Sequence, residues 1–123
     1  MVYDLDNIFA RILRGETPCS KVFEDDHVLA FEDINPQAPN HVLVIPKGEY
    51  VSMDDFSAKA SDAEIAAVIR ALGHIARELG VADVGYRVLS NCGPDGGQEV
   101  PHLHFHLCAG RRLGRMIQPP EKA

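Results

Sequence analysis

The fold of this chain is decided by the stretch Gly96-Gly-Gln-Glu-Val-Pro-His-Leu-His-Phe-His-Leu-Cys-Ala-Gly110. Its three histidines, His102, His104 and His106, alternate with apolar residues. In a β-strand this spacing places the three imidazoles on one face and the apolar side chains on the other, because successive side chains point to opposite faces. The pattern therefore predicts a strand, here called the histidine strand, with one core face and one face available for chemistry.

Two glycines stand shortly before the predicted strand. A tight turn at Gly96 and Gly97 would leave backbone N–H groups free to converge on an anion. We therefore expect a phosphate-binding site at this turn, beside the histidines.

Hydrophobic periodicity on either side of this stretch predicts the other elements. Apolar residues recur at helical spacing in two segments, and the longer one starts at a capping box of Ser61 and Glu64 and ends at Gly80. Short apolar or alternating runs bounded by turn residues predict strands. The expected helices span residues 7–14 and 61–79, and the expected strands span residues 21–24, 27–31, 41–45 and 85–90 together with the histidine strand.

These elements predict an α+β fold in which a five-stranded, mainly antiparallel sheet carries one long and one short helix. Residues 41–45 are apolar on both faces, which is typical of a central strand. The long helix would cover the apolar face of the histidine strand and leave a cleft over its other face. We expect one domain over residues 1–123, with a C-terminal tail over residues 113–123 that lacks periodicity.

Composition argues against several classes of partner. The chain carries 12 Lys and Arg against 18 Asp and Glu, which gives a net charge of −6. We expect neither nucleic acid nor membrane as a partner, because both present anionic surfaces. The three widely spaced cysteines, with no signal peptide and no long apolar run, predict a reduced, cytoplasmic protein.

Three alternating histidines allow more than one chemistry. Neighbouring imidazoles on one strand face are about 7 Å apart at the backbone and the outer two about 13 Å, so two could share a metal ion. A zinc site would then need a further ligand. A neutral imidazole beside an anion-binding turn could instead attack phosphorus. Three exposed histidines without a chemical role are the remaining interpretation.

The run from His102 to Cys108 resembles the His-x-His-x-His signature of the histidine-triad (HIT) nucleotide-binding proteins. Two further stretches strengthen the resemblance, namely Asp33-Ile-Asn-Pro-Gln-Ala-Pro-Asn-His-Val-Leu-Val-Ile-Pro-Lys47, and Asn91 followed by Gly96-Gly97-Gln98. The match extends from about residue 7 to residue 112. It is closest to the Hint branch, whose members are homodimeric purine-nucleoside phosphoramidases.

The resemblance implies a role for each residue that matches a family motif. His104 would be the nucleophile, and His106 and His41 would bind and neutralise the phosphate. His102 would support the hydrogen bonds around them, and Asp33 would bind the ribose hydroxyls. The residues that match the apolar base pocket are Phe31, Ile34, Leu43, Ile8 and Phe9, and those that match the phosphate contacts are Asn91, Gly97, Gln98 and the backbone of Glu99, which replaces a serine of animal members.

The activity that the resemblance implies is hydrolysis of a nucleoside 5′-phosphoramidate, such as an amine or lysyl adduct of AMP, through a covalent nucleotidyl-histidine intermediate. We expect a homodimer, a purine-nucleotide substrate, and no metal or other cofactor. Asn7 and Ala10 stand where some bacterial relatives carry a zinc-binding cysteine pair, and Glu49 where a further histidine often follows. Two alternatives stay open: a nucleotide-binding interaction protein with incidental hydrolysis, and a metal-dependent hydrolase that uses the histidine strand.

Overall fold

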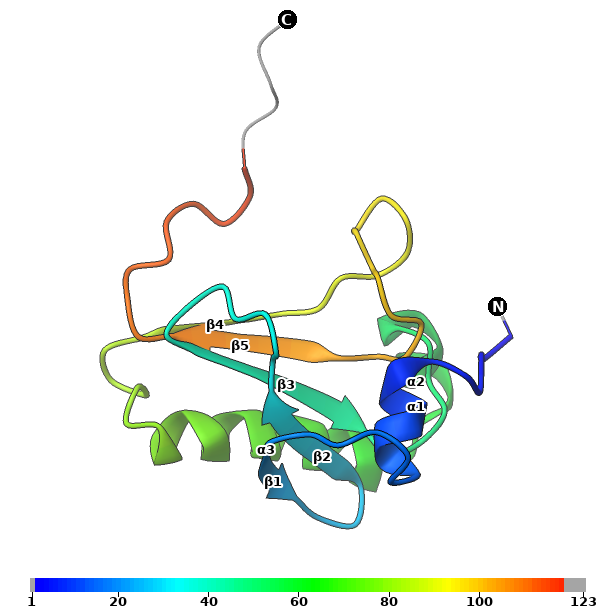
Figure 1. Cartoon of the computed structure of the whole chain (residues 1–123). Coiled ribbons are helices and arrows are strands. Elements are labelled where there is room, and N and C mark those ends of the chain that lie inside the picture. The colour runs from blue at the N-terminus through cyan, green and yellow to red at the C-terminus, as the bar shows by residue number, and fades with distance from the viewer. Residues whose placement is uncertain (1, 119–123) are drawn as a thin grey trace, which may run out of the picture.

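The computed structural model describes residues 2–118, which form three helices and five strands. The helices are α1 (Ile8–Leu13), α2 (Met53–Lys59) and α3 (Asp62–Glu78), and the strands are β1 (Lys21–Glu24), β2 (Val28–Glu32), β3 (Asn40–Pro46), β4 (Tyr86–Leu89) and β5 (Phe105–Ala109). All strands belong to one antiparallel sheet in the order β1-β2-β3-β5-β4 (Figure 1). The predicted α+β class and five-stranded sheet are confirmed.

Strand β3 lies at the centre of the sheet, as its apolar sequence predicts. It pairs with β2 on one side and with β5 on the other, and the register places Leu43 opposite Phe31 and opposite His106. His41 lies opposite Cys108 and is buried. The pairing of β3 with β5 thus brings His41, from the first half of the chain, beside His106, the last histidine of the motif.

Helix α3 covers one face of the sheet (Figure 1). Its inner residues, including Val68 and Ile75, belong to the same buried cluster as Leu103, Phe105 and Leu107. Each such side chain contributes about 1.5–3 kcal/mol when it is fully buried. The predicted packing of the long helix against the apolar residues of the histidine stretch is confirmed.

The other face of the sheet carries a smaller apolar cluster beside α1. Phe9 of α1 packs there with Leu29, Phe31, Leu43 and Ile45. Asn7 caps α1, since its side-chain oxygen accepts the N–H of Ala10 at 2.9 Å. The position of α1 leaves part of this face open, and the cavity described below lies there.

Two features differ from the sequence prediction. Helix α2 was not predicted, because its seven residues bury only Phe56 and show no repeating apolar spacing, although Ser52 and Asp55 form a capping box. The prediction that all three histidines lie on one strand is wrong, since β5 begins at Phe105. The backbone just before β5 forms hydrogen bonds outside the ladder between β3 and β5. The Leu103 N–H, for example, donates to the Tyr50 carbonyl at 2.8 Å.

The predicted C-terminal tail lies partly outside the described residues, which end at residue 118. Residues 113–118 form neither helix nor strand, and the Arg87 guanidinium donates to the carbonyls of Gly114 (2.8 Å) and Arg115 (3.2 Å). Within residues 2–118, every helix is too short or too polar to cross a membrane.

Candidate active site

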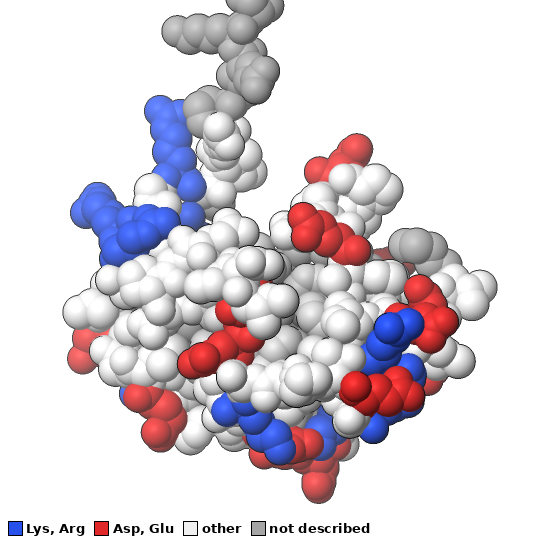
Figure 2. Space-filling model, viewed as in Figure 1, with Lys and Arg blue, Asp and Glu red and all other residues white. Residues whose placement is uncertain are grey.

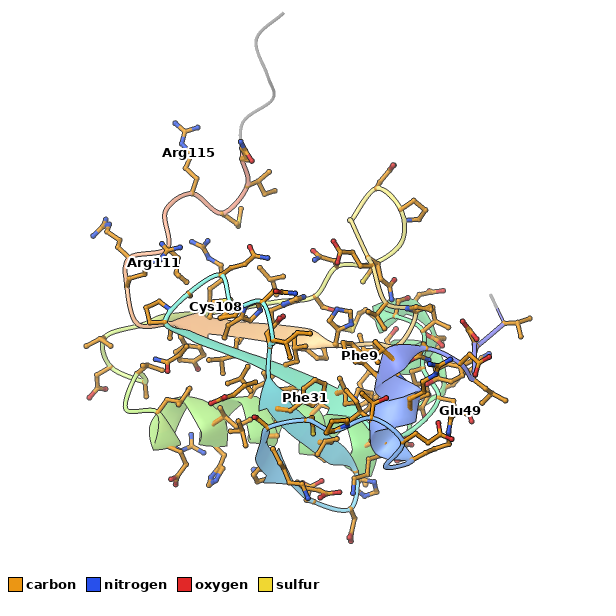
Figure 3. The ribbon with its side chains drawn as sticks, in the orientation of Figure 1. Phe9, Phe31, Glu49, Cys108, Arg111 and Arg115 are labelled. Atoms are coloured by element: carbon orange, nitrogen blue, oxygen red, sulfur yellow. The ribbon has the colours of Figure 1, made fainter. Side chains whose placement is uncertain are left out.

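A cavity of about 380 Å³ lies between α1, the β2–β3 loop and the loop that joins β4 to β5. Its apolar wall comes from α1 and the sheet, where Phe9 of α1 packs edge-on against Phe31 of β2 with ring centroids 5.5 Å apart (both labelled in Figure 3). Most of the predicted site residues line this cavity, namely Ile8, Phe9, Phe31, Asp33, Ile34, Leu43, Asn91, Gly97, Glu99, His104 and His106. His41, His102 and Gln98 are not among the residues that line it.

The His104 ring lines the cavity and has one free nitrogen. Its Nδ1 lies 2.7 Å from the carbonyl oxygen of His102, and a carbonyl can only accept, so Nδ1 carries the proton. Burial lowers the pKa of His104, so the ring is neutral near pH 7 and its Nε2 holds a lone pair. The Phe9 ring packs edge-on against it at 4.9 Å. His104 therefore has the protonation state and the tautomer of a nucleophile.

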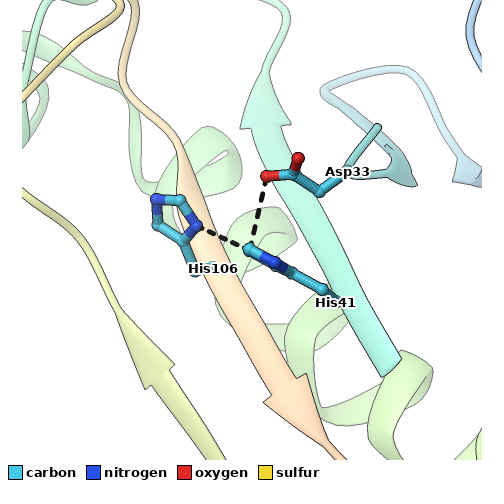
Figure 4. Close-up of side chains that lie close together, drawn as sticks. All are labelled: Asp33, His41 and His106. Atoms are coloured by element: carbon cyan, nitrogen blue, oxygen red, sulfur yellow. Dashed lines mark hydrogen bonds and ion pairs between the residues drawn. The ribbon is translucent and has the colours of Figure 1, made fainter. Parts of the chain in front are cut away.

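His106 is hydrogen-bonded to His41 in a chain with a defined direction. The backbone N–H of Gln37 donates to Nδ1 of His41 at 3.1 Å, so Nδ1 is an acceptor and the ring proton of His41 lies on Nε2. That N–H donates to Nδ1 of His106 at 2.9 Å (Figure 4). His106 must then carry its own proton on Nε2. Because the His106 ring lines the cavity, this N–H is a donor available to an anion.

The pKa of His106 is lowered to about 4, first by burial and then by the repulsion that protonated His104 and His41 rings would exert. The ring thus stays neutral at pH 7 and donates through an N–H group without a formal charge. Asp33 lies beside the same nitrogen of His41 that bonds to His106, with its Oδ2 3.4 Å from Nε2 of His41 (Figure 4). Its Oδ1 accepts the Asn35 N–H at 2.8 Å, which orients the carboxylate at the cavity wall.

His102 is fully buried and does not reach the cavity. Its Nε2 donates to the Pro46 carbonyl at 2.8 Å, and its Nδ1 accepts from the Tyr3 hydroxyl. Burial lowers the pKa of His102 to about 4. The first histidine of the motif is therefore a neutral structural group that acts through its carbonyl.

The glycine turn differs from the expected anion cradle. The N–H groups of Gly97 and Gln98 donate within the turn, to the carbonyls of Pro94 (3.0 Å) and Gly93 (3.1 Å). The Gln98 side chain is also engaged, because its amide nitrogen donates to Val51 and Val100 and its oxygen accepts from Gly93. In this structure Gln98 holds the loop together and does not face the cavity.

The charge around the cavity is negative. Glu32, Asp33 and Glu99 line it, and among residues 2–118 no Lys or Arg does. On the face shown in Figure 2, basic side chains gather at the C-terminal segment and along the opposite rim. Arg111 and Arg115 belong to that segment (Figure 3). A bound phosphate would thus be held by neutral N–H donors rather than by cationic side chains.

The donor atoms of Asp33, His41 and His106 lie within 4.8 Å of one another, which raises the possibility of a metal site. A metal would need an unprotonated Nε2 on His41, and its Nδ1 would then donate to a second group. The Gln37 N–H already points at that Nδ1, so the proton is on Nε2. Without rearrangement of this bond the three residues form a hydrogen-bonded chain and not a ligand set. Asn7, which stands where some bacterial relatives carry a zinc-binding cysteine, uses its side chain to cap α1.

Sequence reasoning missed the groups that orient the histidines. These are the Gln37 N–H, the Pro46 carbonyl and the Tyr3 hydroxyl. Tyr3 lies 99 residues from His102 in the chain, and no local pattern connects the two. Cys19 and Thr17 also line the cavity without having been predicted.

Comparisons with known proteins agree with this geometry. The family model described as the HIT domain matches residues 14–113. A protein of Escherichia coli (strain K12) named purine nucleoside phosphoramidase is 44% identical over 112 residues, covering 91% of this chain and 93% of the relative. A 13.2 kDa HIT-like protein of Azospirillum brasilense is 69% identical over 115 residues, covering 94% of both chains.

The solved structure of a histidine triad protein from Clostridium difficile is 45% identical and has a TM-score of 0.82, covering 94% of this chain and all of the other. The solved structure of a histidine triad nucleotide-binding protein from Candida albicans is 29% identical and has a TM-score of 0.79, covering 96% of this chain and 85% of the other. The domain match and the identity to these relatives show that this chain belongs to the histidine-triad family, the proteins with a HIT domain.

Proposed function

We propose that this protein hydrolyses nucleoside 5′-phosphoramidates to a nucleoside monophosphate and an amine, through a covalent intermediate on Nε2 of His104. The observation that carries the proposal is the tautomer of His104. Its Nδ1–H is held by the His102 carbonyl, so the lone pair is on Nε2 of a neutral ring that lines the cavity. The E. coli relative named purine nucleoside phosphoramidase supports the choice of substrate.

The reaction consists of two displacements. The lone pair of His104 Nε2 attacks the α-phosphorus, the phosphorus–nitrogen bond breaks, and the amine leaves with the bonding electrons and takes up a proton. Water then attacks the same phosphorus, and the bonding electrons return to Nε2. Water supplies one oxygen and one proton to the monophosphate and, in net terms, one proton to the amine. Dividing the reaction into two steps is the general advantage of covalent catalysis.

The neighbouring groups stabilise charge in both steps. When Nε2 is bonded to phosphorus the His104 ring is an imidazolium, and the His102 carbonyl accepts its Nδ1–H at the 2.7 Å seen in the free protein. The Nε2–H of His106 donates to a phosphoryl oxygen. Because these donors and acceptors are fixed before substrate binds, little reorganisation is needed in the transition state.

The rest of the cavity suits a purine nucleoside. The base would lie against the apolar wall formed by Phe9, Phe31 and Leu43. The Asp33 carboxylate, half-buried at the wall, would accept the ribose hydroxyls with its remaining lone pairs. The net charge of −6 is consistent with a small-molecule substrate and with no nucleic-acid or membrane partner.

We also propose that the protein is a homodimer. Strand β4 is at the edge of the sheet, and its Tyr86 and Val88 are 40% and 39% exposed. An open edge next to exposed apolar side chains is a surface that a second copy can cover.

Steady-state turnover of adenosine 5′-phosphoramidate tests the proposed reaction. Replacing His104 by Ala should lower kcat/KM by at least about 10³-fold while AMP binding stays within about ten-fold, since a nucleophile acts mainly in the transition state. His74→Ala is the matched control, because His74 is exposed on α3 and should leave both values unchanged. Excess chelator should have no effect.

A chiral phosphorothioate substrate gives an independent test. Two in-line displacements retain configuration at phosphorus, whereas direct attack by water inverts it. Inversion, activity lost in chelator, or near-normal turnover by the His104→Ala protein would refute the covalent mechanism. AMP binding without turnover in the wild-type protein would favour a nucleotide-binding protein instead.

A further inference from the structure

The Tyr3 side chain contacts the buried His102, which lies 99 residues away in the chain. Its hydroxyl is hydrogen-bonded to His102 Nδ1, and the two rings meet edge to face at a centroid distance of 5.5 Å. The Pro46 carbonyl accepts from Nε2, so Nδ1 of the neutral ring is an acceptor and the Tyr3 hydroxyl is the donor. Both nitrogens of His102 are thus held, and the ring can neither rotate nor change tautomer without losing a bond.

The segment that carries Tyr3 is fastened to the body of the protein. The Asp4 carbonyl accepts from the Asn7 backbone N–H at 3.2 Å and from its side-chain amide at 2.7 Å. The Leu5 carbonyl accepts from the Arg14 guanidinium at 2.8 Å. Residues near a chain end are usually poorly ordered unless such bonds hold them. Here the bonds hold Tyr3 at a defined place beside α1.

His102 in turn determines the state of His104. The backbone carbonyl of His102 accepts the Nδ1–H of His104 at 2.7 Å, which is the bond that leaves the His104 lone pair on Nε2. Phe9 packs edge-on against both rings, at 6.3 Å from His102 and 4.9 Å from His104. This carbonyl belongs to the residue whose side chain is held by Tyr3 and Pro46, and the Cα of His102 joins the two.

We propose that Tyr3 is a positioning residue for the nucleophile, acting through His102 to keep His104 in its Nδ1–H tautomer; this rests on the proposed function of His104. Without the Tyr3 hydroxyl, Nδ1 of His102 loses its donor inside the protein. The ring then rotates or takes up a proton to regain a partner, and the His102 carbonyl turns away from His104. His104 populates the Nε2–H tautomer, which has no lone pair facing the substrate.

The bond is maintained over a wide pH range. Burial raises the pKa of Tyr3, although a side-chain hydrogen bond from Asn7 opposes this, and burial lowers that of His102 to about 4. Both groups are therefore neutral near pH 7, and the hydroxyl can donate to the imidazole under the conditions of the assay.

The first test is imidazole ¹⁵N NMR of the ligand-free protein, with Tyr3→Phe as the variant, since it keeps the ring and removes only the hydroxyl. In the wild-type protein the His102 ring should have a proton on Nε2 and a hydrogen-bonded, unprotonated Nδ1. The His104 ring should have its proton on Nδ1. In Tyr3→Phe the Nδ1 resonance of His102 should move, and His104 should become a mixture of tautomers. Tyr86→Phe is the control, because Tyr86 is partly exposed on the edge strand, and its spectrum should match the wild type.

The second test is turnover of adenosine 5′-phosphoramidate at a temperature well below unfolding. Tyr3→Phe should lower kcat about ten-fold, the factor that corresponds to about 1.4 kcal/mol, or roughly one hydrogen bond. The Kd for AMP should stay within about two-fold, because the hydroxyl lies outside the cavity lining. A residue that only stabilises the fold would lower the melting temperature and leave both kcat and the tautomers unchanged.

Unchanged His102 and His104 tautomers in Tyr3→Phe, or unchanged kcat, would overturn the proposal. If the variant does not fold, the wild-type protein still decides, because a hydroxyl proton of Tyr3 coupled to Nδ1 of His102 must be visible if the bond exists. A wild-type protein that shows this bond and these tautomers but does not hydrolyse the substrate would refute the proposed function and leave the positioning of His104 intact.

Discussion

Replacing Gln98 by Ala should destabilise the protein more than it weakens nucleotide binding. The Gln98 side chain makes three hydrogen bonds, from Nε2 to the carbonyls of Val51 (2.6 Å) and Val100 (3.0 Å) and from the Gly93 N–H to Oε1 (3.0 Å). The bond to Val51 connects the β4–β5 loop to the segment before α2, and the other two bonds lie within the loop. The same residue was predicted from the sequence to contact phosphate, so the substitution distinguishes a loop tether from a ligand contact.

The size of the effect follows from the three bonds. Each contributes about 0.5–1.5 kcal/mol to stability, and Gln98 is half-buried, so the loss in unfolding free energy should be about 2 kcal/mol. At about 2.1 cal/mol/K per residue, the unfolding entropy of a 123-residue chain is about 0.26 kcal/mol/K. The melting temperature should therefore fall by about 8 °C.

Thermal and urea unfolding at one fixed protein concentration measure this effect, since the stability of a dimer depends on concentration. Calorimetric titration with AMP measures binding, which should weaken by less than about three-fold. Gln118→Ala is the control, because Gln118 is exposed and should change neither quantity. A Gln98→Ala protein with wild-type stability and AMP binding weakened ten-fold or more would show that Gln98 contacts the ligand.

Three further predictions follow from the same structure. Asp33→Asn should weaken AMP binding about ten-fold, the value of one or two charge-assisted hydrogen bonds, and 2′-deoxy-AMP binding as tightly as AMP would disprove the ribose contact. Lowering the pH should destabilise the fold, because burial lowers the pKa of His102 to about 4 while the same histidine in the unfolded chain takes up a proton near 6.5. The unfolding free energy measured in urea should therefore fall by about 2–3 kcal/mol from this residue between pH 7 and pH 4.5. An unfolding free energy that does not change with pH would contradict the neutral burial of His102. Light scattering in the micromolar range should give twice the chain mass of 13.5 kDa, whereas a monomer mass would refute the dimer.

Much of the fold is predictable from local patterns. The long helix was recognised from its apolar spacing and from Ser61 and Glu64, which form the expected capping box. The central strand was recognised because residues 41–45 are apolar on both faces, and β3 is buried along almost its whole length. Helix α2 was missed because a seven-residue helix with one buried side chain has no period to detect.

The site was predictable as a set of residues but not as an arrangement. The motif predicted that His104 and His106 lie close together, and their ring centroids are 5.1 Å apart. It did not predict that His102 is turned into the core, or that the turn N–H groups of Gly97 and Gln98 are used within the loop. Alternation along a strand says which face a side chain occupies only while the strand continues, and β5 begins after His104.

By itself the sequence determined the α+β class and the order of its main elements, because periodicity, caps and turns depend on neighbours within a few positions. The residues near the cavity were identified by the resemblance of their motifs to the histidine-triad family. Only the tertiary structure decided which ring nitrogen carries the proton in the histidines of the site. The proton positions depend on single partners at hydrogen-bonding distance, the Tyr3 hydroxyl, the Gln37 N–H and the Pro46 carbonyl. Tyr3 and Pro46 lie 99 and 56 residues from His102, and folding alone brings such groups within hydrogen-bonding distance.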